Sequence, residues 1–194
     1  MTFAEIFSLA IGAILVNNVL LSQFLGICSF IGVSKKKSSS IGMGLAVLFV
    51  LVIATLVTWM LYNWVLIPLN ISFLSTIVFI LVIATLVQFC EMDIKKYMPA
   101  LYKVLGIYLP LITTNCAILG VANFVNPQNS YDLLTSLIYA VSIGLGYILV
   151  MYIFSGIREK IEFAPIPKPF KGAAIALVIA GFMAMAFAGF AGIA

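Results

Sequence analysis

The stretch LGIYLPLITTNCAILGVAN, residues 105–123, decides the fold. It lies inside a long uncharged run, which predicts that the chain crosses or enters a membrane here. It also carries polar or helix-breaking residues at the depth expected for the bilayer: Pro110, Thr113, Thr114, Asn115 and Cys116. A proline removes a helical hydrogen bond and clashes with the preceding turn. Backbone freed in this way is tolerated in lipid only where protein or a cavity satisfies it. The stretch therefore predicts an interrupted membrane helix with a thiol just past the break.

A similar pattern occurs earlier in the chain. LGICSF at 25–30 aligns with LGVANF at 119–124, and Asn17-Asn18 again puts amides into an apolar run. The ungapped alignment does not superpose the cysteines, because Cys116 falls opposite Ser22. By itself this similarity is weak evidence for an internal repeat, and the topology predicted for the whole chain supports it.

Composition excludes a soluble domain. The chain has 194 residues, of which 64% are hydrophobic and 8% charged, and soluble domains have about 25% charged residues. It has no histidine, the commonest side chain for acid–base chemistry near neutral pH. Its three cysteines form neither a CxxC motif nor a disulfide framework. The net charge of +4 is explained by basic loops and gives no reason to expect a nucleic-acid partner.

The apolar runs predict six transmembrane helices. We place them at about 6–33, 41–62, 71–89, 104–125, 133–157 and from 172 to the end. The first run would be about 42 Å long as one straight helix, against roughly 30 Å of hydrocarbon. Steep tilt would accommodate it, but we favour a break near Asn17-Asn18 or Gly26. The run lacks a preceding basic residue and a credible cleavage site, so it is not a signal peptide.

The basic residues predict the orientation. The loops after the first, third and fifth spans, at 34–40, 90–103 and 158–171, hold all 10 Lys and Arg. The positive-inside rule places these loops in the cytoplasm and both termini on the outer face. The same rule is the favoured explanation of the run Lys35-Lys36-Lys37, with lipid headgroup binding as the alternative.

Three crossings in each half of the chain predict an inverted repeat. The expected fold is a single all-α transmembrane domain over 1–194, a 3+3 inverted repeat with half-repeats at about 1–92 and 93–194. The first and fourth helices correspond, and both are expected to be interrupted. In such folds the broken helices meet near the middle of the bilayer.

The cysteines allow three interpretations: metal ligands, inert buried thiols or reactive redox thiols. For Cys90 the inert interpretation is favoured, because cysteine packs as a small apolar residue. Cys28 and Cys116, on corresponding broken helices, are better candidates for ligands. Two thiolates do not complete an iron–sulfur or structural zinc site, which usually has four ligands. We favour iron–sulfur, with the missing pair supplied by another chain.

Several motifs resemble the RnfA/NqrE family of membrane subunits. They are Asn17-Asn18, FLGICSFIGVSKK (24–36), VQFCEM (87–92), LGIYLPLITTNCAILGV (105–121) and GIREK (156–160). The resemblance runs nearly end to end. Asn17 in place of Glu, Thr114 in place of Val and a short second external loop favour the Rnf branch over the NqrE branch.

The resemblance implies a six-helix protein that pairs with a homologous, oppositely oriented RnfE-like subunit. In that family, the cysteines at the positions of Cys28 and Cys116 bind one intramembrane [2Fe-2S] cluster shared with the partner. The Rnf complex, which also contains the components RnfB, RnfC, RnfD and RnfG, passes electrons between ferredoxin and NAD and translocates Na+ or H+. The chain would then be part of an enzyme complex in a prokaryotic cytoplasmic membrane, with no catalytic residues of its own. Cys90 departs from the family pattern and receives no ligand role.

Polar residues and glycines near the two cysteines are candidates for surrounding the cluster or lining an ion path. They are Asn17, Asn18, Gly26, Thr113, Thr114, Asn115 and Gly120. Ordinary hydrogen bonding between helices is the alternative for the polar members. Besides an NqrE-type subunit, the rival functions are a non-redox inverted-repeat transporter and a scaffold for other subunits. The sequence leaves open whether Na+ or H+ moves.

Overall fold

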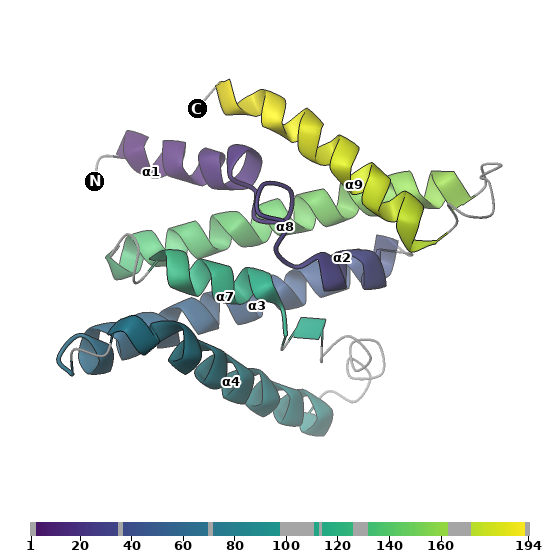
Figure 1. The fold of residues 1–194 in the computed structure, drawn as a ribbon. Helices are drawn as coiled ribbons and strands as arrows, with labels where there is room; N and C mark the ends of the chain where they lie inside the picture. The colour runs from purple at the N-terminus through teal and green to yellow at the C-terminus, as the bar shows by residue number, and fades with distance from the viewer. Residues whose placement is uncertain are drawn as a thin grey trace. The chain divides into compact units, whose positions relative to one another are not determined.

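The regular structure of the chain is helical throughout the part that can be described (Figure 1). The computed structural model describes residues 3–34, 37–69, 72–97, 111–112, 114–125, 132–162 and 172–192, and none of these forms a strand. The prediction of an all-α chain is confirmed for these residues. Pro110 and Thr113 lie outside them, so the expected break at the proline is not described.

Two compact units make up the chain. The first combines residues 1–45 with 142–194, and the second contains residues 46–141. Helices α3 (Lys37–Leu61) and α8 (Leu133–Glu162) each contribute one part to each unit.

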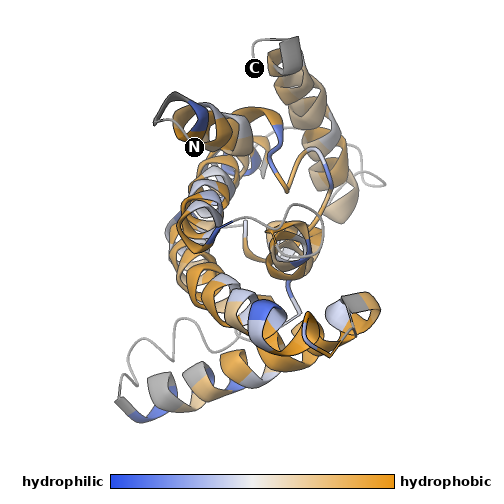
Figure 2. Cartoon of the chain, turned by 90° about the vertical axis from the view of Figure 1, so that its left-hand side faces the viewer, coloured by the Kyte–Doolittle hydropathy of each residue, from blue (hydrophilic) through white to orange (hydrophobic). Residues whose placement is uncertain are grey.

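Two helices are long and apolar enough to cross a membrane. One joins α3 to a π-helical turn and covers Lys37–Leu66, with a mean hydropathy of 2.6, and the other is Leu133–Ile161 of α8, with 2.2. Spanning the hydrocarbon takes about 20 apolar residues. Figure 2 shows hydrophobic colour around most of the described helical surface. Large apolar side chains such as Phe49, Leu81 and Phe182 are exposed, as expected for surfaces that face lipid.

The first unit contains the broken N-terminal segment and the C-terminal helix. Its elements besides parts of α3 and α8 are α1 (Phe3–Ile11), a π-helical turn (Gly12–Val16), α2 (Ile27–Val33), α9 (Ala173–Ala188) and a 3-10 turn (Gly189–Gly192). Close backbone approach holds it together: a Cβ at Gly44 would lie 2.7 Å from the Ile148 side chain. Small residues at helix crossings allow such contacts in membranes.

The second unit is built on the packing of α4 (Ser75–Tyr97) against α7 (Cys116–Asn123). The Thr76 hydroxyl donates to Asn123 Oδ1 at 3.3 Å, linking the two helices. The rings of Phe124 and Tyr139 stack with centroids 5.2 Å apart. A π-helical turn (Tyr62–Leu66) and a 3-10 turn (Ser72–Leu74) complete the unit.

Three of the polar segments expected as loops are partly helical. Helix α4 continues through Glu91 and Lys95 to Tyr97, α8 continues to Glu162, and α3 already begins at Lys37. Charged side chains need to leave the hydrocarbon, but the helical backbone does not need to end there. Lys95 and Lys96 also lie in the last turn of α4, where positive charge complements the helix dipole. The helices therefore extend beyond the predicted spans at these ends.

Candidate functional site: two interrupted segments that present cysteines

The first helix stops at Asn17, as the length of the first apolar run predicted. The Asn17 N–H still bonds to Gly12 O at 2.7 Å, but its backbone leaves the helical region. Residues 17–26 are non-helical, and the helix resumes only at Ile27. Figure 1 shows this irregular connection between α1 and α2. Neither α1 with its π-turn nor α2 is long enough to span the hydrocarbon alone.

Asn18 satisfies the backbone that this break leaves open. Its side chain is buried, with Nδ2 donating to Ile14 O at 2.9 Å and to Gly146 O at 3.1 Å. Its Oδ1 accepts from Leu20 N–H at 3.1 Å. A Cβ at Gly146 would lie 3.0 Å from Asn18 Nδ2, so the glycine makes room for this amide. The contacts give Asn18 a structural role that its polarity alone did not specify.

Asn17 is exposed and borders a cavity of about 350 Å³. The π-helical turn, Asn18 and Ser22 form one part of the lining, and Ala184, Phe187 and Ala188 of α9 form another. The small side chains of Ala184 and Ala188 on α9 thus lie beside the broken helix. The cavity therefore lies between the polar residues of the first break and the C-terminal helix α9.

Gly26 turns the chain into α2. It is the N-cap of this helix and has φ of 86°, in the left-handed region where a side chain is disfavoured. Its carbonyl accepts from the Ser29 hydroxyl at 2.8 Å and from Phe30 N–H at 3.1 Å. Phe24 also has positive φ, 54°. The sequence FLGIC therefore encodes a strained turn immediately before the thiol.

Cys28 is the second residue of α2 and is exposed, while its two C-terminal neighbours are buried. The Ser29 hydroxyl bonds to the Tyr147 hydroxyl at 2.8 Å. The ring of Phe30 stacks on Phe154 with centroids 3.9 Å apart. One face of α2 is thus fixed to α8, and the face with the thiol is left open.

Arg158 holds the other end of α2. Its Nη1 donates to Ile31 O and to Ser34 Oγ, both at 2.7 Å. Carbonyls at a helix C-terminus lack helical partners, and a guanidinium satisfies them well. From the sequence, Arg158 was expected to contribute to the orientation and to the GIREK motif, and no contact with α2 was predicted. An arginine next to an apolar span does not indicate by itself that its side chain bonds to Ile31, which is 127 positions away in the sequence.

The second interruption lies between residue 112 and Cys116, and Thr113 is outside the described residues. Residues 111–112 are helical, Thr114 lies in a turn, and α7 begins at Cys116. Asn115 is the N-cap, with extended backbone and Oδ1 accepting from Ala117 N–H at 3.1 Å. Asparagine is among the preferred N-cap residues.

Cys116 is the first residue of α7 and is exposed. Its thiol lies 3.9 Å from Thr114 O, a weak contact. Gly120 lies in the middle of α7, and its carbonyl accepts from Phe124 N–H. The placing of Gly120 around the cluster or the ion path stays a prediction.

Asn115 also holds a buried donor without an acceptor. The side chain is 6% exposed, and Nδ2 has no hydrogen-bond partner in the described part of the chain. The bond from Ala117 N–H fixes Oδ1 as the acceptor, so Nδ2 must be the other atom. A buried polar group without a partner costs roughly 1–3 kcal/mol.

Each cysteine is described within its own unit, Cys28 in the first and Cys116 in the second. No three Cys, Asp or Glu side chains gather as metal ligands among the described residues. Those residues alone therefore do not complete a metal site.

Comparison with known proteins agrees with this architecture. The profile of the Rnf-Nqr subunit family, described as a membrane protein, matches residues 6–194. The chain belongs to the Rnf-Nqr family. It is 52% identical over 185 residues to the RnfA component of the ion-translocating oxidoreductase complex of Shigella boydii serotype 4, covering 95% of each chain. The corresponding components from Escherichia coli strain K12 and Sodalis glossinidius are 51% and 50% identical over the same share. The resemblance seen in the motifs is confirmed for this Rnf-Nqr chain.

Proposed function

We propose that this Rnf-Nqr chain is the RnfA component of an ion-translocating oxidoreductase complex in a bacterial cytoplasmic membrane. Relatives at about half identity over 95% of both chains are components of such complexes, and they are bacterial. This supports the Rnf branch over an NqrE-type subunit. The complex would pass electrons between ferredoxin and NAD and move Na+ or H+ across the membrane.

The proposed architecture is six spans in a 3+3 inverted repeat with both termini outside. Two long apolar helices and the described interruption between α1 and α2 support it. The distribution of all 10 Lys and Arg over three alternate loops supports the orientation.

Cys28 and Cys116 are the proposed ligands of one half of a [2Fe-2S] cluster, and a homologous RnfE-like subunit would supply the other half. The observation that carries this proposal is the exposure of both thiols in the first turn of a helix that restarts after a break. Free cysteine is among the most buried residue types. Two exposed thiols on rigidly anchored helices fit ligands for a group that the chain shares with a partner.

The buried amide of Asn115 provides an independent test of fit. Cluster sulfurs accept hydrogen bonds, and such bonds tune the reduction potential. Asn115 Nδ2 is a donor next to a proposed ligand and has no acceptor among the described residues. The residues present are therefore compatible with a thiolate-bound iron–sulfur group.

When bound, the cluster would supply one-electron transfer within the membrane. The chain's own residues position its ligands: Gly26 makes the turn before Cys28, and Ser29 with Phe30 fixes α2 on α8. Asn115 starts α7 and thereby sets the position of Cys116. The position of each thiol therefore depends on the turn and helix start that these neighbouring residues stabilise.

The proposed ion path uses the polar surface at the first break. Asn17, Ser22 and the adjoining cavity offer amide and hydroxyl oxygens, which are suitable ligands for a hard cation. The six acidic residues lie at the ends of spans or in loops, so no carboxylate inside the bilayer is available for this task. A change in buried charge would favour compensation by a cation.

The test is EPR spectroscopy and iron analysis of the purified complex carrying Cys28→Ser or Cys116→Ser. Each variant should lose the [2Fe-2S] signal that depends on this chain, with all partner subunits still present. Cys90→Ser is the matched control and should keep the signal, because Cys90 has no ligand role. Unchanged iron content and signal in both ligand variants would overturn the proposal and favour a transporter or scaffold.

A further inference from the structure

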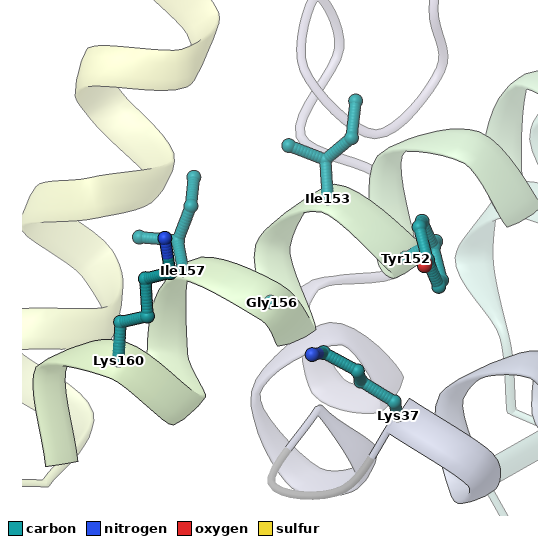
Figure 3. Close-up of a pocket in the computed structure, with 6 residues that line it drawn as sticks. All are labelled: Lys37, Tyr152, Ile153, Gly156, Ile157 and Lys160. Carbon is teal, nitrogen blue, oxygen red and sulfur yellow. The ribbon is translucent and has the colours of Figure 1, made fainter.

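A groove of about 270 Å³ lies between the beginning of α3 and the last turns of α8 (Figure 3). All its lining residues belong to the first unit, and none is a candidate for the cluster or the ion path. They are Lys37, Tyr152, Ile153, Gly156, Ile157 and Lys160. This groove is therefore separate from the site described above.

The groove depends on one face of α8. Its five α8 residues are spaced so that they share a single helical face. Gly156 lies in the middle, and a Cβ built there would be 3.7 Å from Lys37 Cε. Figure 3 shows the Lys37 ammonium group directed at the turn of α8 that contains Gly156. Because Gly156 has no side chain, the groove stays open at this position.

Positive charge predominates around the groove. Lys37 Nζ is 2.9 Å from Glu159 Oε2, and both side chains are about half exposed. Lys160 is exposed and forms no ion pair with a described residue. Two lysines therefore line the groove, and one of them forms the ion pair with Glu159.

The groove also lies at an edge of a candidate membrane span. The apolar run of α8 ends at Ile157, and Lys160 lies one turn beyond it. Tyr152 and Ile153, two turns earlier, are 52% and 38% exposed. The groove therefore has a cationic end at the membrane surface and an apolar floor toward the hydrocarbon.

We propose that this groove binds one anionic phospholipid of the cytoplasmic leaflet. Its phosphodiester would lie between Lys37 and Lys160, and an acyl chain would follow Ile153 and Ile157. Basic pockets at the cytoplasmic ends of membrane helices are suited to anionic headgroups. A zwitterionic lipid would bring an ammonium group toward the lysines, and a free phosphate would leave the apolar floor in contact with water. Charge and apolar surface together favour an anionic lipid.

The test uses the whole purified complex in detergent with a photoactivatable phosphatidylglycerol that carries its reactive group on the acyl chain. Mass spectrometry should locate crosslinks within residues 152–160. Unlabelled phosphatidylglycerol should compete, whereas phosphatidylethanolamine and inorganic phosphate should not. Lys160→Gln should reduce the crosslink about fivefold, the effect of one basic residue near an anionic headgroup.

Three further variants separate a groove from diffuse attraction. Gly156→Leu should abolish crosslinking by filling the groove without changing any charge. Gly156→Ala should retain it, because the added Cβ makes only an ordinary contact with Lys37. Lys95→Gln on α4 removes a positive charge that does not line the groove and should leave crosslinking unchanged. Equal loss in Lys95→Gln and Lys160→Gln, or competition by phosphatidylethanolamine as strong as by phosphatidylglycerol, would overturn the proposal.

Discussion

Helices α2 and α7 each begin after a non-helical segment, and each has an exposed cysteine in its first turn. The two non-helical segments are stabilised by different interactions. Before α2, a glycine with φ of 86° reverses the chain, and Asn18 bonds to the freed backbone. Before α7, Asn115 caps the new helix with Oδ1 and leaves Nδ2 buried without an acceptor among the described residues. Among the described residues, the amide of the first segment uses both its nitrogen and its oxygen, and the amide of the second uses only its oxygen.

This difference predicts that Asn18 and Asn115 respond differently when each is replaced with aspartate. A buried amide that makes three hydrogen bonds is required for the fold. A buried amide that uses only its oxygen loses no hydrogen bond among the described residues when its nitrogen is replaced. Replacing asparagine with aspartate removes the nitrogen donors and retains an acceptor, so it separates the two cases.

The largest expected effect is that of Asn18→Asp. The variant loses both donor bonds and places a carboxylate oxygen beside Ile14 O and Gly146 O. We expect a loss of about 2–4 kcal/mol in the free energy of unfolding, measured as a lower thermal midpoint of the complex in detergent. Asn17→Asp is the control, because the neighbouring side chain is exposed. A midpoint for Asn18→Asp as high as that of the control would show that the first segment is not fixed by this amide.

An intermediate effect is expected for Gly26→Ala. A side chain in the left-handed region costs about 1–2 kcal/mol, and relief of that strain would shift Cys28 at the start of α2. The thermal midpoint should fall, and the EPR signal of the cluster should weaken or change shape. Gly12→Ala is the matched control, since an added Cβ there meets no atom within 4 Å and the residue lacks positive φ. If both variants behave alike, the turn before Cys28 does not depend on glycine.

The smallest effect on stability is expected for Asn115→Asp. Aspartate caps helices about as well as asparagine, and the change removes no hydrogen bond made by a described residue, so the loss in unfolding free energy should be smaller than for the other two variants. The midpoint potential of the cluster should nevertheless fall by about 40 mV or more. One lost hydrogen bond of about 1 kcal/mol corresponds to that shift for a one-electron couple, and added negative charge acts in the same direction.

Asn123→Asp controls for the added charge in the Asn115 experiment. Asn123 ends the same helix, and its Oδ1 already serves as an acceptor for Thr76. Its effect on the potential should be much smaller than that of Asn115→Asp. Equal shifts would show that Nδ2 of Asn115 does not donate to the cluster.

The sequence was sufficient to predict the class of fold and the position of the first break. Composition excluded a soluble protein, and the length of the run from Ile6 to Val33 favoured an interruption near Asn17-Asn18 or Gly26 over a steep tilt. The structure has a non-helical connection over 17–26, between these two signals. Length and residue type carry this information locally, so no tertiary contact was needed.

The roles of individual polar residues could not be predicted in the same way. Asn17 and Asn18 are identical neighbours, yet one is exposed and the other makes three hydrogen bonds. The partner that distinguishes them is Gly146, which is 128 positions away. The same holds for Ser29 with Tyr147 and for Arg158 with Ile31, because contacts between distant helices leave no local pattern.

The helix ends were also misjudged for a physical reason. Hydropathy reports where a segment leaves the hydrocarbon, whereas the helix ends where its backbone hydrogen bonds end. Helix α4 therefore continues about two turns past Phe89, the last apolar residue assigned to the third span.

The central claim, that the sulfurs of Cys28 and Cys116 bind iron, is tested most directly by thiol alkylation of the unaltered complex. The complex is treated anaerobically with N-ethylmaleimide before and after removal of iron by a chelator, and labelling of each cysteine is quantified by mass spectrometry. Both thiols should be protected while iron is bound and labelled once it is removed. Equal labelling of these two thiols in the two states would contradict the claim.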